Sequence, residues 1–529
     1  MGDVFSHQGT DMALRVIWTS LAVIVLTAST EVLAASLHAE IDRLIAAKAG
    51  ATPLAAACDD ATFLRRIYFD LAGRIPRLEE TQKFLTDAAP DKRTKLIDEL
   101  LAGPDYPRRM EELFHVMFME RRGDNPEWST FLRVSFEANK PWDQLTREII
   151  HPVADDANRR GAAFFHTRRL DKSGQETTDY AGLTRDIGRL FMGVDLQCAQ
   201  CHDHLFIGDY KQVDFQGLLT VFANTSIKGG DFPAIAEKPA TTKLEFASVF
   251  EGKKKLTGPR IPFGTEFEVP PATGSAVALV ATALPSPDNR LFVQNAVNRL
   301  WFVMMGRGLV HPLDLQHAAN PPSHPELLEL LSREFVAQKF DVKWLIRELA
   351  LSNTYSRATE IGAGEPPPVE LFAVAIERRL SAEQLLRSML IATGDPAETK
   401  DEAKLLAAIT PLRPKALKAF ANPAKEPEEG YNTTVQEALT LLNDEAFQKL
   451  FDVRPGSLTE RLAKIEDANQ LAEELYLTIL IRRPSDEERV EVGTFLGQFA
   501  TAVPAKQKVD AVRYLAWALV AATEFSINH

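Results

Sequence analysis

The chain has 529 residues, of which 45% are hydrophobic and 25% charged, so it is long enough to bury more than one sizeable core. Its formal net charge of −13 argues against nucleic-acid binding through a basic surface. It contains only three cysteines, which excludes a disulfide framework as the main support of the fold.

Residues 1–35 have the pattern of a secretory signal peptide. A 13-residue apolar run at residues 16–28 follows Arg15, and small residues come after it. The run is too short for a stable membrane span. We therefore expect export to the periplasm or the cell surface, with no stable membrane span after cleavage; an uncleaved anchor is the alternative. A start at Met12 rather than Met1 would give the leader a more usual beginning.

Residues 36–206 are predicted to form a helical domain, because apolar residues recur in them at helical spacing. Residues 154–178 are polar and basic, so they are expected to be a surface loop with Arg168 and Arg169 in solvent. The predicted helices cover residues 36–48, 60–72, 78–87, 91–101, 106–121, 128–138, 142–150 and 179–197.

The rest of the chain is predicted to hold an insertion and a second helical domain. Residues 207–287 are rich in turn residues and are expected to form a loop-rich insertion with short strands, at 244–250 and 267–269, and a hairpin tip at 253–255. Residues 288–529 should be helical again over 290–305, 325–338, 342–352, 369–393, 434–450 and 458–465, with connectors at 362–368 and 394–430. The predicted fold class is mainly α and multi-helical: two helical domains with a loop-rich, partly β insertion between them.

One stretch occurs twice at an offset of 408 residues. Each copy reads as a helix, an Arg/Pro turn and a second helix with carboxylates in its first turn, which favours a repeated helical hairpin. The matching residues are Tyr68, Leu71, Arg74, Pro76, Glu79 and Glu80 in the first copy and Tyr476, Ile479, Arg482, Pro484, Glu487 and Glu488 in the second.

The main candidate site is the run Cys198-Ala199-Gln200-Cys201-His202-Asp203-His204. Two thiols three positions apart, followed at once by a histidine, are the attachment signature of haem c. On a helical turn the two sulfurs can reach the two vinyl groups of one porphyrin, and His202 can offer its imidazole to the iron. The helix over 179–197 is expected to deliver Cys198 at its carboxyl end. Export supports this prediction, because covalent haem attachment takes place in an exported compartment. Attachment would use Cys198 and Cys201 and leave Cys58 as a lone thiol, expected to be buried.

Other interpretations of the same residues stay open. His202 and His204 are both candidate metal ligands, and the zinc alternative takes Cys58, Cys198, Cys201 and His204 as its four ligands. A redox Cys-x-x-Cys pair or inert thiols are further alternatives. The distal iron ligand is undetermined; the candidates are His115, His317, His324, Met117 and Met304.

A hydrolase acting on extracellular polymers is the least favoured class. The chain contains no Gly-x-Ser-x-Gly, His-Glu-x-x-His or phosphate-loop pattern. Asp203, the Asn298-Arg299 pair and the Ser323-His324 pair are polar groups at turns or helix entries, where structural capping is the simpler role. No catalytic residue is assigned.

Several motifs together resemble one family, the planctomycete-type secreted proteins that join a cytochrome-like domain of unknown function to a second domain of unknown function. The segments that carry the resemblance are 65–76, 196–204, 297–301, 306–310, 321–328, 352–355, 378–383 and 436–443. The resemblance covers the chain from about residue 40 to its end and implies export and haem binding. The sequence departs from the family pattern at Leu205 and Ile207, where the family has proline and aspartate, and it has no second Cys-x-x-Cys-His.

The sequence therefore predicts an exported haem c-binding protein with a redox or electron-transfer role and a redox partner protein. The alternative is a zinc-stabilised scaffold or binding protein of the cell envelope. Substrate and oligomeric state are left open.

Overall fold

The computed structural model describes residues 36–171, 178–229, 234–238, 243–270, 274–362, 365–426, 440–441, 443–499 and 504–529. The signal-peptide prediction lies outside these residues, as do residues 434–439 and 442 of the helix predicted at 434–450; the described remainder of that segment holds the short helix Glu445–Gln448 and the start of a 3₁₀ turn, Lys449–Phe451. Within them, no helix has the length and apolar character needed to cross a membrane.

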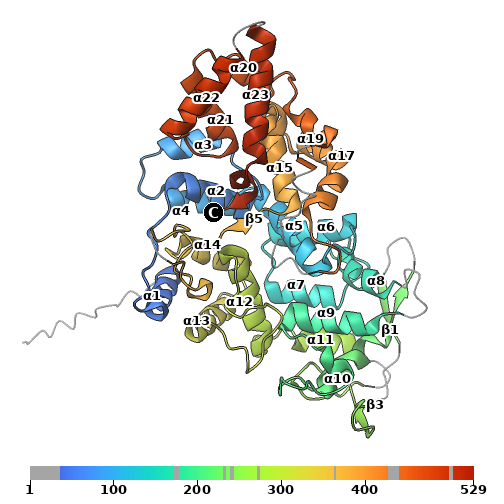
Figure 1. The fold of residues 1–529 in the computed structure, drawn as a ribbon. Helices are drawn as coiled ribbons and strands as arrows, with labels where there is room; N and C mark the ends of the chain where they lie inside the picture. The colour runs from blue at the N-terminus through green and yellow to red at the C-terminus, as the bar shows by residue number, and fades with distance from the viewer. Residues whose placement is uncertain are drawn as a thin grey trace, which may run out of the picture. The chain divides into compact units, whose positions relative to one another are not determined.

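The fold is mainly α-helical, as predicted (Figure 1). In the part before residue 290 the helices are α1 (Leu37–Ala49), α2 (Asp60–Ala72), α3 (Leu78–Thr86), α4 (Lys92–Ala102), α5 (Asp105–Met119), α6 (Pro126–Glu137), α7 (Trp142–Ile150), α8 (Phe164–Leu170), α9 (Tyr180–Met192), α10 (Gln212–Phe222) and α11 (Ala276–Ala283). Those that follow are α12 (Arg290–Met305), α13 (Pro325–Ala337), α14 (Val342–Leu351), α15 (Ala382–Thr393), α16 (Pro396–Lys400), α17 (Glu402–Phe420), α19 (Glu445–Gln448), α20 (Leu458–Ala463), α21 (Ala468–Ile479), α22 (Asp486–Gln498), α23 (Pro504–Ala521) and α24 (Thr523–Ser526).

The strands of the described residues form three separate antiparallel pairs. Strand β1 (Thr225–Lys228) pairs with β2 (Ala234–Glu237), and β3 (Leu244–Ala247) pairs with β4 (Lys254–Thr257). The third pair joins distant parts of the chain, β5 (Arg378–Arg379) with β6 (Ile527–Asn528). The first two pairs lie in the predicted insertion, which is therefore partly β, as expected.

Local signals explain where many helices begin and end. Helix α2 begins after Asp59, whose side chain accepts from the Thr62 amide, and ends at Gly73 in the left-handed region. Helix α12 has the same arrangement, with Asn289 at its start and Gly306 at its end. These capping residues account for the agreement between the predicted and the observed bounds of both helices.

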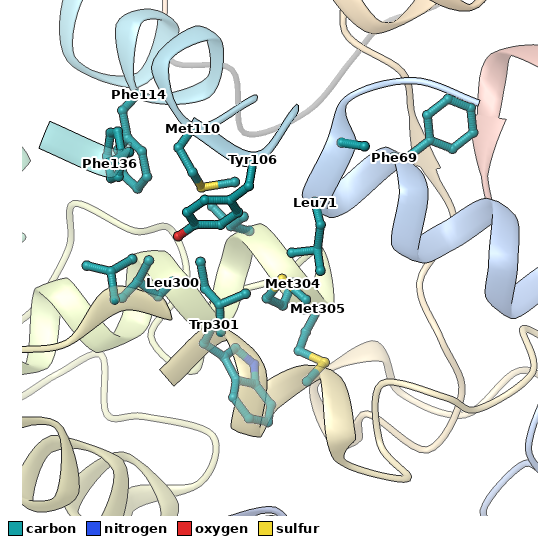
Figure 2. Close-up of a cluster of buried hydrophobic side chains, with 14 of the residues drawn as sticks. Phe69, Leu71, Tyr106, Met110, Phe114, Phe136, Leu300, Trp301, Met304 and Met305 are labelled. Carbon is teal, nitrogen blue, oxygen red and sulfur yellow. The ribbon is translucent and has the colours of Figure 1, made fainter. Parts of the chain in front are cut away.

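The two predicted helical domains share one hydrophobic core. Figure 2 shows side chains of α2, α5 and α6 meeting side chains of α12. The labelled residues are Phe69, Leu71, Tyr106, Met110, Phe114, Phe136, Leu300, Trp301, Met304 and Met305. The carboxyl end lies beside α2 (Figure 1), where Arg66 Nε donates to the carbonyl of His529 at 2.6 Å. Residues Leu37–His529 thus form one compact unit, and the domain boundaries expected near 206 and 287 stay predictions.

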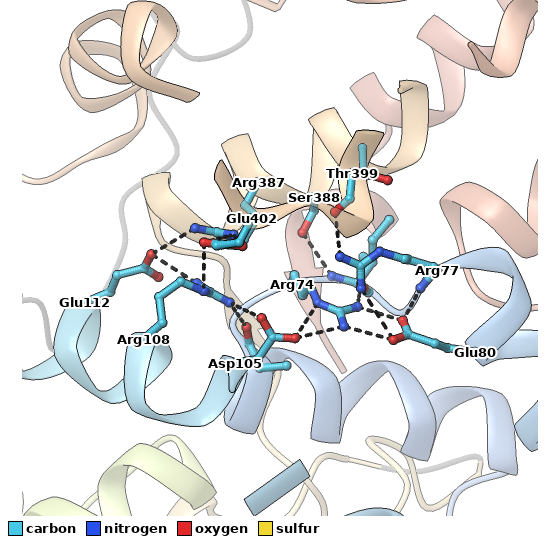
Figure 3. A network of polar contacts seen from close by, with 12 residues as sticks. Arg74, Arg77, Glu80, Asp105, Arg108, Glu112, Arg387, Ser388, Thr399 and Glu402 are labelled. Atoms are coloured by element: carbon cyan, nitrogen blue, oxygen red, sulfur yellow. Dashed lines mark hydrogen bonds and ion pairs between the residues drawn. The ribbon is translucent and has the colours of Figure 1, made fainter. Parts of the chain in front are cut away.

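The internal repeat has the same contacts in both copies. The guanidinium carbon of Arg74 lies 5.1 Å from the centre of the Tyr68 ring, and that of Arg482 lies 5.3 Å from the Tyr476 ring. Each arginine also binds the glutamate six positions later, at 2.7 Å in the first copy and 2.8 Å in the second. Figure 3 shows the first copy, and α3 of that copy packs against α21 of the second. The repeat is therefore a structural unit.

The prediction of a surface loop over residues 154–178 is wrong in the central part of that segment. Arg160–Ala163 form a 3₁₀ turn that continues into α8. Arg169 is buried rather than solvated, and its Nε binds Asp186 at 2.6 Å. The charge of Arg169 is therefore paired in the interior, whereas the side chain of Arg168 is exposed, as predicted.

Three further segments differ from the predictions. The insertion contains helices α10 and α11 as well as strands. No strand forms over 267–269, and two of residues 253–255 lie in strand β4 rather than at the tip of a hairpin. The segment predicted as one helix over 369–393 holds a 3₁₀ turn (Val369–Leu371), strand β5 and α15. Within the expected connector 394–430, α17 is helical despite two internal prolines. In each case packing against other elements overrides the local signal.

Candidate functional site

The thiol motif follows α9 after a short connection. Helix α9 ends at Met192 because Gly193 takes the left-handed conformation, with φ 68°. The prediction that this helix delivers Cys198 at its carboxyl end is therefore wrong. Cys198 instead begins a separate 3₁₀ turn, Cys198–Gln200.

The connection is fixed by backbone bonds to the loop after α12. The amide of Gln316 donates to the carbonyl of Gly193 at 2.8 Å, and the amide of Asp195 donates to the carbonyl of Asp314 at 2.9 Å. A Cβ at Gly193 would lie 2.8 Å from Gln316 Nε2 and 2.9 Å from Asn295 Oδ1. Only glycine fits this approach without displacing its neighbours.

The motif itself is held by α10 and by the β3–β4 hairpin. Gln216 of α10 donates from Nε2 to the carbonyl of Gln200 at 2.8 Å. The amide of Val249, just after β3, donates to the carbonyl of Cys201 at 3.1 Å. The turn that carries the cysteines is therefore a fixed element of the fold, which a rigid cofactor site requires.

The three cysteines lie in different surroundings. Cys198 and Cys201 are exposed, whereas Cys58 is buried, and burial raises the pKa of the Cys58 thiol. The carbonyl of Cys58 accepts from Arg93, and its amide donates to the carbonyl of Ser356. The two motif thiols are thus open to a partner molecule, and Cys58 behaves as a core residue.

The hydrogen bond of His202 fixes its tautomer. Nδ1 lies 2.7 Å from the backbone carbonyl of Asp203. A carbonyl oxygen can only accept, so Nδ1 carries the proton of the neutral ring. The lone pair is then on Nε2, which is the arrangement a metal-binding histidine needs.

His204 has the opposite arrangement. Its Nδ1 accepts from the amides of Phe206 at 3.1 Å and Ile207 at 2.9 Å. An N–H group can only donate, so the proton of the neutral ring is on Nε2. His204 therefore caps its own turn and presents a donor. The sequence favoured His202 as the iron ligand and kept His204 as a metal candidate, and the hydrogen bonds distinguish the two rings.

Large apolar side chains are exposed around the motif. Leu205 and Phe206 follow His204, and Phe206 is 88% exposed. Val249 and Phe250 lie at the tip of the β3–β4 hairpin, and the Phe250 ring centre is 4.7 Å from that of His202. Phe250 is 67% exposed despite this contact. Exposed apolar residues gathered at one place mark a surface that something covers.

The polar residues considered for hydrolysis have structural roles. Asp203 accepts from the amide of Gln212 at 2.8 Å, at the start of α10. Asn298 bonds both the amide and the carbonyl of Val310, at 2.9 and 2.8 Å. His324 is buried, with Nδ1 3.0 Å from Ser323 Oγ. These are structural contacts, but only Asp203 acts at a helix start: Asn298 lies inside α12, and His324 makes no capping bond at the start of α13.

The zinc ligands of the alternative prediction are not brought together. Among the described residues, no group of three or more His, Cys, Asp or Glu side chains is arranged to hold a metal ion. Cys58 lies just before α2, bonded to Arg93 of α4 and to Ser356 after α14, whereas the motif lies against α10.

The distal-ligand candidates are scattered. His115 pairs with Asp124 at 3.1 Å, and Met304 is buried in the core of Figure 2. His317 lies closest to the motif: its ring centre is 5.6 Å from that of Tyr210, which also contacts His204. Burial lowers the pKa of His317, with the His204 charge acting in the same direction and Asp209 opposing it.

Family models match two parts of the chain. Residues 40–227 match PSCyt2, described as a protein of unknown function (DUF1549), and residues 278–411 match PSD1, described as a protein of unknown function (DUF1553). The chain carries both of these domains. The thiol motif lies in the first, and the segment between the matches contains the β3–β4 hairpin. No curated protein and no solved structure matches the chain.

The sequence did not identify the hairpin as part of the site. Val249 and Phe250 are about fifty positions from the motif, in a segment outside both domain matches. No spacing rule connects them. The only local signal was Leu205, an apolar residue where the resemblance leads one to expect proline.

Proposed function

We propose that the protein is an exported haem c protein, with Cys198 and Cys201 as the attachment residues and His202 as the axial ligand. The observation that carries the proposal is the tautomer of His202, which leaves the lone pair on Nε2 in the residue that directly follows two exposed cysteines. A bound haem would supply one-electron redox chemistry.

The attachment reaction needs no oxidant. Cys198 and Cys201 would hold the haem through thioether bonds, each thiol S–H adding across one vinyl group so that sulfur takes one carbon and the proton the other. The reaction does require both cysteines to be reduced and accessible, and the exposure of Cys198 and Cys201 supports this.

The surrounding residues would then cover and orient the group. Leu205, Phe206, Val249 and Phe250 offer apolar surface that a porphyrin would remove from water, at about 25 cal/mol for each Å² buried. The Nε2–H of His204 is a donor suited to a carboxylate of the macrocycle. A redox role also implies a partner protein that exchanges electrons with the site.

The test is covalent haem in protein that is exported together with a cytochrome c maturation system. Wild-type protein should stain for haem after denaturing electrophoresis, and Cys198→Ala/Cys201→Ala should not. Cys58→Ala is the matched control, because it removes the third thiol away from the site and should keep the stain. A wild-type band that stays unstained, in cells that load a reference cytochrome c, would refute the proposal.

A second pair of variants separates the two histidines. His202→Ala should shift the visible spectrum of the reduced protein, because an axial ligand is lost, whereas His204→Ala should leave the axial ligation unchanged. Equal spectral changes in both variants would contradict the assignment made from their tautomers.

A further inference from the structure

A second feature of the structure, separate from the thiol motif, is a cavity in the middle of the fold. Its volume is about 340 Å³, and its lining includes residues of α2, α5, α9, α12, β5, α15 and β6. None of the described residues between 193 and 270 contributes to the lining. The volume is at the lower end of the range that small-molecule sites occupy.

Ion pairs fix the polar walls of the cavity. On one side, Arg189 binds Asp314 at 2.8 Å, and Arg299 binds the same carboxylate. On the other side, Asp70 is bound by Arg378 at 2.8 Å and by Asn528 Nδ2 at 3.1 Å. These side chains are held before any ligand arrives, which lowers the cost of ordering them on binding.

The charges of the lining nearly balance. Among the described residues, five arginines and six carboxylates line the cavity. Arg189, Arg299 and Arg378 bind carboxylates, and Arg109 and Arg379 also interact with other groups of the chain. A ligand with a full charge would have to compete with these pairs and would add an unbalanced charge to a buried site.

Among the buried polar atoms of the lining, Arg299 Nε, Asn528 Oδ1 and Glu112 Oε2 have neither a hydrogen bond nor an ion pair within the part of the chain that the structure describes, whereas Glu120 Oε1 pairs with Arg189. Arg299 is 3% exposed and Asn528 is 4% exposed. Figure 3 shows why Glu112 has one oxygen left, since Arg108 and Arg387 both approach Oε1. Buried polar groups in folded proteins normally have partners, so these atoms point to hydrogen-bonding groups from outside the chain.

The unpartnered atoms comprise one donor and two acceptors, and a hydroxyl group can serve either type. Leu113, Phe302 and Ile376 add apolar surface to the same lining, suited to C–H faces. We propose that the cavity binds a small neutral polyhydroxylated molecule, a sugar of one or two rings.

The test uses the full exported chain and a panel of neutral sugars: glucose, galactose, mannose, fucose, maltose and cellobiose. Saturation-transfer NMR and the thermal unfolding midpoint report binding. At least one sugar should bind with a Kd of about 1 mM or lower. Leu113→Trp, which fills the cavity, should weaken this binding at least tenfold, and Val490→Trp, an exposed position on α22, should leave it unchanged.

Three results would overturn the proposal. The first is that none of the six sugars binds. The second is that a sugar binds equally well to Leu113→Trp and to wild type. The third is that citrate or spermine displaces the sugar at equal concentration, which would show that the site prefers a charged ligand. If Leu113→Trp does not fold, Met117→Trp, which also projects from α5 into the lining, takes its place.

Discussion

Gly193→Ala tests how the fold holds the thiol motif. The left-handed φ of 68° costs a residue with a Cβ about 1–2 kcal/mol. The new methyl group would also lie 2.8 Å from Gln316 Nε2 and 2.9 Å from Asn295 Oδ1, and relieving such overpacking costs about 1–3 kcal/mol. Both neighbours are buried, and Asn295 Nδ2 is held by the carbonyl of Leu190 at 2.8 Å, so neither moves freely.

We therefore expect Gly193→Ala to lower the free energy of unfolding by about 2–5 kcal/mol, measured by urea denaturation followed by circular dichroism. Gly208→Ala is the matched control. Gly208 lies on the other side of the motif, has no positive φ, and has no atom within 4 Å of its ideal Cβ. It should be neutral or slightly stabilising. Equal stability of the two variants would refute the role given to Gly193.

Two further predictions concern stability. Burial lowers the pKa of His166 to about 4, so its neutral form contributes fully to the free energy of unfolding above pH 6.5, and this contribution is lost as the pH falls toward 4. At pH 5 the loss should be about 2 kcal/mol. In urea denaturation, the free energy of unfolding of a His166→Gln variant should fall by about 2 kcal/mol less than that of wild type between pH 7 and pH 5. Arg74→Ala should cost about 3 kcal/mol because the Arg74 side chain is 4% exposed among its carboxylates, whereas Arg482→Ala, at 33% exposure in the second copy of the repeat, should cost about 1 kcal/mol. Thermal unfolding of both arginine variants would check this order, and a larger loss for Arg482→Ala would contradict it.

The helical part of the fold could be predicted where local signals agree. Helices α2, α7 and α12 have the predicted bounds because periodic apolar residues lie between clear capping or turn residues. The repeated hairpin was also visible, since its arginine and glutamates lie close together in the sequence. The prediction failed at α8, where Arg169 looks like a surface residue and is buried by its pairing with Asp186. Its partner is seventeen positions away, beyond any local rule.

The candidate site, like the fold, could be predicted from the sequence only where the pattern is local. The thiols and His202 follow from a short pattern, but the difference between His202 and His204 depends on which backbone groups meet each ring. The exposed apolar surface depends on Val249 and Phe250, which approach the motif only in the folded chain. The central cavity depends on residues from seven helices and strands and left no pattern in the sequence.

Peptide mapping of the exported protein tests the central proposal most directly. After coexpression with the maturation system, proteolysis and mass spectrometry should show haem on the peptide that contains Cys198 and Cys201, with Cys58 alone available to iodoacetamide in the denatured chain. If iodoacetamide modifies all three cysteines, in cells where a reference cytochrome c is fully loaded, the protein is not a haem c protein.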